Sequence, residues 1–89
     1  MTEREITQRT RAYVVENFLY MRQDFRFDDQ DSLLTKGVID SLGVMELVEF
    51  VSAEFGVQVD PADITEENFG TLAGIARYVA AKRATRTPA

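Results

Sequence analysis

Residues 37–51 constrain this 89-residue chain most, because they predict a turn that leads directly into an amphipathic helix. Gly37 can adopt a positive φ and redirect the chain, and the apolar Val38 and Ile39 after it are expected to anchor the turn to a core. Asp40 is a favoured N-cap residue, and its charge suits the positive end of a helix dipole. Ser41 then lies in the first turn of the helix, where free backbone N–H groups favour an attached anion.

The helix predicted for residues 41–55 has two different faces. With about 100° between successive residues, the stripe expected to be buried consists of Val44, Leu47, Val48, Val51 and Phe55. The opposite face carries Leu42, Glu46, Glu49 and Ala53, flanked by Met45 and Phe50. No lysine or arginine occurs in residues 37–76, so neither glutamate has a basic partner four residues along the helix. An apolar side chain beside an exposed serine and bordered by acids suits docking of a basic protein, although scattered exposed apolar residues are also common.

The composition excludes several kinds of chemistry. The chain has no cysteine, and therefore no disulfide and no thiol of its own. It has no histidine, which is the commonest general base and metal ligand. No apolar run approaches the roughly 20 residues of a membrane span, and the first five residues lack the pattern of a signal peptide. We therefore expect a cytoplasmic protein that neither enters a membrane nor holds a metal.

Charge is distributed unevenly along the chain, whose net charge is −5. Residues 23–69 contain twelve acidic and two basic residues, whereas residues 70–89 contain four basic residues and no acidic one. The acidic middle argues against nucleic-acid binding, which requires a basic footprint, and favours basic protein partners. The length suits one small domain. We expect that domain to span residues 1–89, to be structured over about 2–84 with a frayed tail at 85–89, and to be monomeric.

The N-terminal part of the chain predicts a helix from Thr2 to about Met21, followed by a long loop. Thr2 and Glu5 have the spacing of a capping box. The residues expected to face the core recur at helical spacing and are Ile6, Tyr13, Val14, Phe18 and Met21. In the loop at 22–36, the apolar residues expected to hold the segment against the helices are Phe25, Phe27, Leu33 and Leu34.

Three carboxylates in this loop, Asp28, Asp29 and Asp31, raise the question of a metal site. They do not fit the calcium-loop pattern, because the third oxygen ligand and the glycine are both missing. We expect a solvated acidic loop, with weak binding of a divalent ion as the open alternative.

The C-terminal half predicts two helices after Gly56, which is a natural C′ residue. Residues 57–59 alternate in polarity but have no partner strand, so we expect an extended loop. Pro61 suits the first turn of a short helix at 61–64, with Ile64 and Phe69 as core anchors. Thr71 is a good N-cap for a last helix at 72–84. The buried stripe of that helix is Leu72, Ile75, Ala76 and Val79, and Lys82 and Arg83 in its last turn suit its dipole.

The segment Gly37-Val38-Ile39-Asp40-Ser41-Leu42, followed by an acidic amphipathic helix, resembles the attachment site of the acyl carrier and peptidyl carrier proteins over about residues 31–82. The resemblance implies an all-α fold, a small four-helix bundle with a long loop between the first and second helices and a short third helix. It also implies that Ser41 carries 4′-phosphopantetheine, derived from coenzyme A, through a phosphodiester. Asp40 and Leu42 would help a phosphopantetheinyl transferase to recognise the site.

The same resemblance implies a carrier rather than an enzyme. The terminal thiol of the arm would hold an acyl or aminoacyl group as a thioester and present it to partner enzymes. Those partners would be an adenylate-forming acyl or aminoacyl ligase and downstream acyl-processing enzymes, docking at Leu42, Met45, Glu46 and Glu49. Carriers of housekeeping fatty acid synthesis usually have an acid where this chain has Gly43, and often an apolar residue where it has Glu49. The sequence is therefore more similar to stand-alone carriers of specialised pathways, including aminoacyl and D-alanyl carriers.

Two other functions are compatible with parts of the sequence. An unmodified acidic helical adaptor could bind basic partners through the same helix face, but it has no special need for the hydroxyl of Ser41. A hydrolase with Ser41 as its nucleophile lacks a histidine to activate the serine and lacks the Gly-x-Ser-x-Gly turn.

Overall fold

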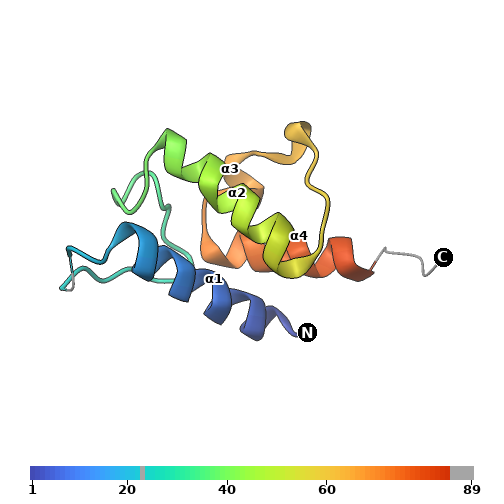
Figure 1. The fold of residues 1–89 in the computed structure, drawn as a ribbon, viewed down its shortest axis with the longest axis horizontal. Helices are drawn as coiled ribbons and strands as arrows, with labels where there is room; N and C mark the ends of the chain where they lie inside the picture. Colours follow the sequence, from blue (N-terminus) through green and yellow to red (C-terminus); the bar gives the residue numbers. More distant parts are fainter. Residues whose placement is uncertain (23, 85–89) are drawn as a thin grey trace.

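Helices and their connecting loops make up the computed structural model, which describes residues 1–22 and 24–84 and has no strand in that part of the chain (Figure 1). Its elements are α1 (Glu3–Phe18), α2 (Ser41–Phe55), the 3₁₀ turn η1 (Pro61–Asp63), α3 (Glu66–Phe69) and α4 (Leu72–Ala84). α1 packs most extensively against α4, α3 packs on α4, and α2 contacts α1. The predicted all-α fold with a long first loop and a short third helix is confirmed. The tail predicted at 85–89 lies outside the described residues.

α1 begins as predicted but ends three residues before Met21. The hydroxyl of Thr2 accepts a hydrogen bond from the Glu5 backbone N–H at 3.1 Å, as the capping-box spacing indicated. The chain leaves the helix at Leu19, which is buried, while Met21 is 81% exposed. The prediction that Met21 faces the core was therefore wrong, because helical spacing no longer applies beyond the end of the helix. Tyr13 and Phe18 are half-buried at the edge of the core, and Ile6 and Val14 are fully buried.

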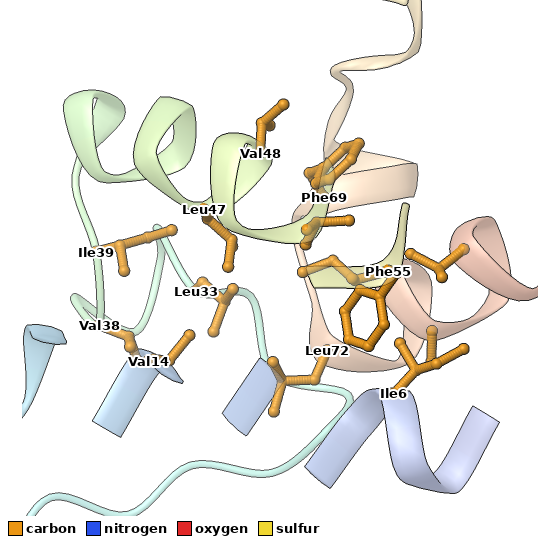
Figure 2. Packing of buried hydrophobic residues seen from close by; sticks show 14 of the residues in the cluster. Ile6, Val14, Leu33, Val38, Ile39, Leu47, Val48, Phe55, Phe69 and Leu72 are labelled. Atoms are coloured by element: carbon orange, nitrogen blue, oxygen red, sulfur yellow. The ribbon is translucent and has the colours of Figure 1, made fainter. Parts of the chain in front are cut away.

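The core is formed by all four helices and by the long loop. Its fully buried side chains come from α1 (Ile6, Val14), the loop (Leu33), α2 (Leu47, Val51, Phe55) and α4 (Leu72, Ile75, Val79), with Phe69 of α3 almost as deeply buried. Leu33 lies between Val14 and Leu47 (Figure 2). Thr10 is the buried polar residue in the part of the chain that the structure describes, and its hydroxyl donates to the Ile6 carbonyl at 2.7 Å, which satisfies it within its own helix. Sequence periodicity overlooked it, because threonine is counted as polar.

The long loop is fastened by backbone hydrogen bonds to the start of the C-terminal helices. Leu33 N–H donates to the Gly70 carbonyl at 2.8 Å, and Ala73 N–H donates to the Asp29 carbonyl at 3.0 Å. Phe27 is buried and Phe25 is half-buried, as predicted, but Leu34 is 42% exposed. The expectation that Leu34 helps to hold the loop was wrong, since its neighbour Leu33 alone fills the core position.

The C-terminal half follows the prediction except for the third helix. Gly56 ends α2 in the left-handed conformation with φ 64°, and residues 57–60 are extended loop. The turn beginning at Pro61 is a 3₁₀ turn of three residues, and the short third helix starts later, at Glu66. Thr65 determines that start, because its hydroxyl accepts from the Asn68 N–H at 3.2 Å. Phe69 is buried, whereas Ile64 is only half-buried against the core.

α4 has the predicted bounds, and its four predicted core residues are buried. The hydroxyl of Thr71 accepts from the Gly74 N–H at 2.9 Å, as expected of an N-cap. Arg83 Nη1 donates to the Phe55 carbonyl at 2.6 Å, so it interacts with the C-terminal end of α2 as well as lying in the last turn of its own helix. Tyr78 Oη donates to Asp63 Oδ2 at 2.7 Å, which fixes η1 to α4.

Candidate cofactor attachment site

The turn before α2 is held in place by backbone hydrogen bonds and by buried side chains. Gly37 has a φ of 77°, a conformation that glycine adopts readily. The backbone N–H groups of Val38 and Ile39 both donate to the Leu33 carbonyl, at 2.9 and 3.2 Å, and both side chains are buried. The start of α2 is thereby held in place against the core.

Asp40 caps α2, and Ser41 is its first residue. Asp40 has an extended backbone, and its Oδ1 accepts from the Gly43 N–H at 2.8 Å. Because the carboxylate of Asp40 serves as the cap, the hydroxyl of Ser41 is left exposed at the helix N-terminus. An anionic substituent on that oxygen would lie at the positive end of the α2 dipole. The exposed hydroxyl is therefore compatible with attachment of a phosphodiester.

The outward face of α2 carries the residues predicted for docking. Leu42 is 78% exposed and Met45 is 50% exposed, and both Glu46 and Glu49 are exposed beside them. We call these four residues the acidic face. Among the described residues, neither glutamate forms a salt bridge with a basic side chain. The acidic face thus combines apolar surface with negative charge close to Ser41.

Tyr13 joins this face to α1. Its ring stacks on Phe50 with centroids 4.0 Å apart, and its hydroxyl donates to the Glu46 carbonyl at 3.4 Å. Partial burial, and then the charges of Glu46 and Glu49, raise the pKa of Tyr13 above the ordinary value of 10.0. The sequence predicted only a core role for this residue, and the direct contact with α2 could not be read from spacing within α1.

A hollow of about 580 Å³ opens on the α1 side of Ser41. Its lining comprises Phe18, Arg22, Gly37, Val38, Ile39, Asp40, Leu42, Gly43 and Glu46. Gly43 allows the helices to approach here, since a Cβ at this position would lie 3.0 Å from Phe18 Cε1 and 3.1 Å from Ile39 Cβ. Arg22 Nη1 donates to the Gly37 carbonyl at 2.8 Å, and the guanidinium lies 4.2 Å from the Phe25 ring centroid. No sequence signal singled out Arg22, because its neighbours in the hollow are 15 or more residues further along the chain, Phe18 excepted.

Two of the three predicted loop carboxylates, those of Asp29 and Asp31, have partners within the protein. Asp29 Oδ1 pairs with Arg11 Nη2 at 2.6 Å, and Asp31 Oδ2 accepts from the Asp28 N–H at 2.7 Å. Within residues 1–22 and 24–84, no group of three or more histidines, cysteines, aspartates or glutamates is placed to hold a metal ion. The carboxylates of Asp29 and Asp31 therefore serve the conformation of the loop.

Comparison with known families identifies the kind of domain. Residues 15–79, most of the chain and all of α2, match the PP-binding family, described as a phosphopantetheine attachment site. The chain belongs to this family. A phosphopantetheine-binding carrier domain holds a covalent 4′-phosphopantetheine and is a carrier without catalytic activity, as the sequence predicted. No curated protein matches the chain in a sequence search. In the described part of the carrier domain, no helix has the length and apolar character needed to cross a membrane.

Carrier domains of this kind generally interact with a phosphopantetheinyl transferase and with biosynthetic enzymes. When bound, the cofactor supplies a thiol that holds the cargo as a thioester. At the candidate site the chain itself contributes the exposed Ser41, a helix N-terminus and an anchored turn.

Proposed function

We propose that Ser41 is the residue that carries 4′-phosphopantetheine, and that the protein is a stand-alone carrier of acyl or aminoacyl groups in a specialised biosynthetic pathway of the cytoplasm. The observation that carries this proposal is the exposure of Ser41 at the first position of α2, immediately after a cap made by Asp40.

The other serines support the choice of Ser41. Ser32 Oγ donates to Glu66 Oε1 at 2.8 Å, and Ser52 Oγ donates to the Val57 carbonyl at 2.7 Å. The threonines that precede helices, Thr2, Thr65 and Thr71, accept backbone hydrogen bonds as N-caps. Ser41 differs from all of them, because the N-cap role at its helix is taken by its neighbour Asp40. Its hydroxyl is therefore accessible to a transferase, with Asp40 and Leu42 on either side as recognition residues.

The acidic face supports the proposed partners. Leu42 and Met45 supply an apolar centre, and Glu46 and Glu49 supply charge that no described cation neutralises. Such a surface suits a basic, partly apolar patch on a transferase, on an adenylate-forming acyl or aminoacyl ligase and on downstream acyl-processing enzymes. Gly43 and Glu49 depart from the housekeeping pattern, which supports a specialised pathway.

Intact-mass spectrometry tests the attachment residue. The purified apo protein is incubated with coenzyme A, magnesium and a broad-specificity phosphopantetheinyl transferase. The wild type and Ser32→Ala, the matched control, should gain the mass of one phosphopantetheine, and Ser41→Ala should gain none. Modification of Ser41→Ala at the wild-type level would refute the assignment, and an unmodified wild type would favour the adaptor.

A further inference from the structure

We propose that the hollow on the α1 side of Ser41 is a binding site for the phosphopantetheine arm itself, and that Arg22 is the residue that positions the arm there. The inference rests on the proposed attachment at Ser41, and it adds where the arm lies when no partner enzyme is bound.

The position of the hollow is the first argument. Asp40 and Leu42, the two neighbours of Ser41 in the chain, both line it. An arm that begins at the Ser41 oxygen therefore begins at the rim. The residues that line the hollow come from the end of α1, the long loop and the start of α2. These segments lie at the same end of the molecule (Figure 1).

The chemistry of the walls is the second argument. The lining residues include the apolar Phe18, Val38, Ile39 and Leu42 and the charged Arg22, Asp40 and Glu46. A phosphopantetheine arm has the same mixture, with a phosphodiester, a branched dimethyl group and two amides. The volume of about 580 Å³ falls in the range of about 300–1,000 Å³ that is usual for sites of small molecules and cofactors.

The third argument is charge. Arg22 is the one cation among the described residues that line the hollow, and the lining also includes the acidic Asp40 and Glu46. A phosphodiester at Ser41 adds a further negative charge beside these acids, which only Arg22 offsets from within the hollow.

Arg22 is also held in place before any arm is attached. Its Nη1 donates to the Gly37 carbonyl at 2.8 Å, and its guanidinium packs on Phe25. An arginine has five N–H donors, and Gly37 takes one of them. The planar group can therefore keep its place and still donate to anionic or carbonyl oxygens.

Nuclear Overhauser effects between the arm and the protein test this proposal. Wild-type holo protein, labelled with ¹³C and ¹⁵N and loaded with an unlabelled arm, is first verified by intact mass. We expect contacts from the dimethyl group of the arm to the side chains of Val38, Ile39 and Leu42. Arg22→Gln should lose them, Arg22→Lys should retain them in part because it keeps the charge without the planar fork, and Arg77→Gln, the control in α4, should retain them fully.

The outcomes separate this inference from the proposed function. Failure of the wild type to gain mass would overturn both. A wild type that gains mass at Ser41 but shows no arm contacts, or shows them only to side chains outside the hollow, would overturn this inference alone. Circular dichroism of each apo variant checks that the fold is retained. Arm contacts that survive unchanged in a folded Arg22→Gln would remove Arg22 from the proposal.

Discussion

Two surfaces of this carrier domain expose large apolar side chains, and they differ in what their charges do. The first is the acidic face of α2, with Leu42 and Met45. The second is a basic groove of about 810 Å³ along α1 and the loop after it, where Val15 is partly exposed and Tyr20 is 64% exposed. The described residues that line the basic groove are Gln8, Arg11, Ala12, Val15, Glu16, Leu19, Tyr20, Arg22, Phe25, Arg26 and Phe27.

The arginines of the basic groove are used within the molecule. Arg11 pairs with Asp29, donates to the Phe27 carbonyl at 3.0 Å and packs over the Phe27 ring. Arg22 packs on Phe25. The glutamates of the acidic face form no such ion pairs among the described residues. Exposed apolar surface is therefore shared by both regions, and what distinguishes the acidic face is charge without a described ion-pair partner beside the exposed Ser41.

The largest expected effect compares two leucines of the same helix. Leu47 is fully buried and Leu42 is 78% exposed. Leu47→Ala should lower the free energy of unfolding by about 2–5 kcal/mol, because it leaves a cavity in the core. Leu42→Ala should change it by no more than about 0.5 kcal/mol. Urea denaturation monitored by circular dichroism measures both. Comparable losses in the two variants would mean that the faces of α2 are wrongly assigned.

Charge reversal on the acidic face should slow loading of the carrier. Glu46→Lys and Glu49→Lys should each raise the KM of the loading ligase about tenfold at low ionic strength, with a smaller effect on kcat, because they repel a basic partner. The effect should shrink at high salt, where exposed charges are screened. Leu42→Ala should also weaken docking, with little dependence on salt.

Glu16→Lys provides the matched control, since it makes the same charge change in the basic groove of α1. Steady-state kinetics on each holo variant at low and high salt would reveal the difference. Equal effects of Glu16→Lys and Glu46→Lys would show that overall charge, and not the acidic face, governs docking.

Neutralising Arg11 should loosen the long loop without touching the acidic face. Arg11→Gln removes the partly exposed ion pair with Asp29 and the contact with the buried Phe27 ring, and should cost about 1 kcal/mol of stability. Hydrogen exchange provides a local measurement, because the Ala73 N–H is bonded to the Asp29 carbonyl. Its protection should fall in Arg11→Gln and should hold in Arg4→Gln, a change at the exposed first turn of α1. Unaltered protection of the Ala73 N–H would argue against a role for Arg11 in holding the long loop in place.

The smallest expected effect is on the titration of Tyr13. Because its folded-state pKa is raised above 10.0, the contribution of Tyr13 to stability is complete below pH 10 and is lost as the pH rises through the folded-state pKa. Glu46→Gln and Glu49→Gln should each lower that pKa only in part, since burial is the larger cause. Titration of the Tyr13 ring followed by ¹³C NMR measures the change. An unchanged Tyr13 pKa in both variants would show that the charges of Glu46 and Glu49 do not affect Tyr13.

Local signals in the sequence predicted the parts of the structure that depend on neighbouring residues. Gly37, the Asp40 cap, the bounds of α2 and the Gly56 terminus follow from turn and capping preferences within a few residues. α4 and its buried stripe follow from periodicity. The attachment residue and the acidic face could therefore be proposed from the sequence.

Features that depend on contacts between distant segments could not be predicted in this way. The burial of Leu19 and exposure of Met21 depend on where the chain leaves α1, and the bond from Arg83 to the Phe55 carbonyl links residues 28 apart. Arg22 entered the candidate site only when the structure brought it to the Gly37 carbonyl. Periodicity within one element carries no information about such pairs.

Localisation of the modification in wild-type protein tests the central claim most directly. Cleavage after Lys36 and Arg77 releases residues 37–77, because no lysine or arginine lies between them. This peptide contains Ser41 and Ser52 but not Ser32. After treatment with coenzyme A and transferase, tandem mass spectrometry should place one phosphopantetheine between Asp40 and Leu42. An added mass on Ser52 or on a threonine of this peptide, or on any other peptide, would contradict the assignment of Ser41 as the attachment residue.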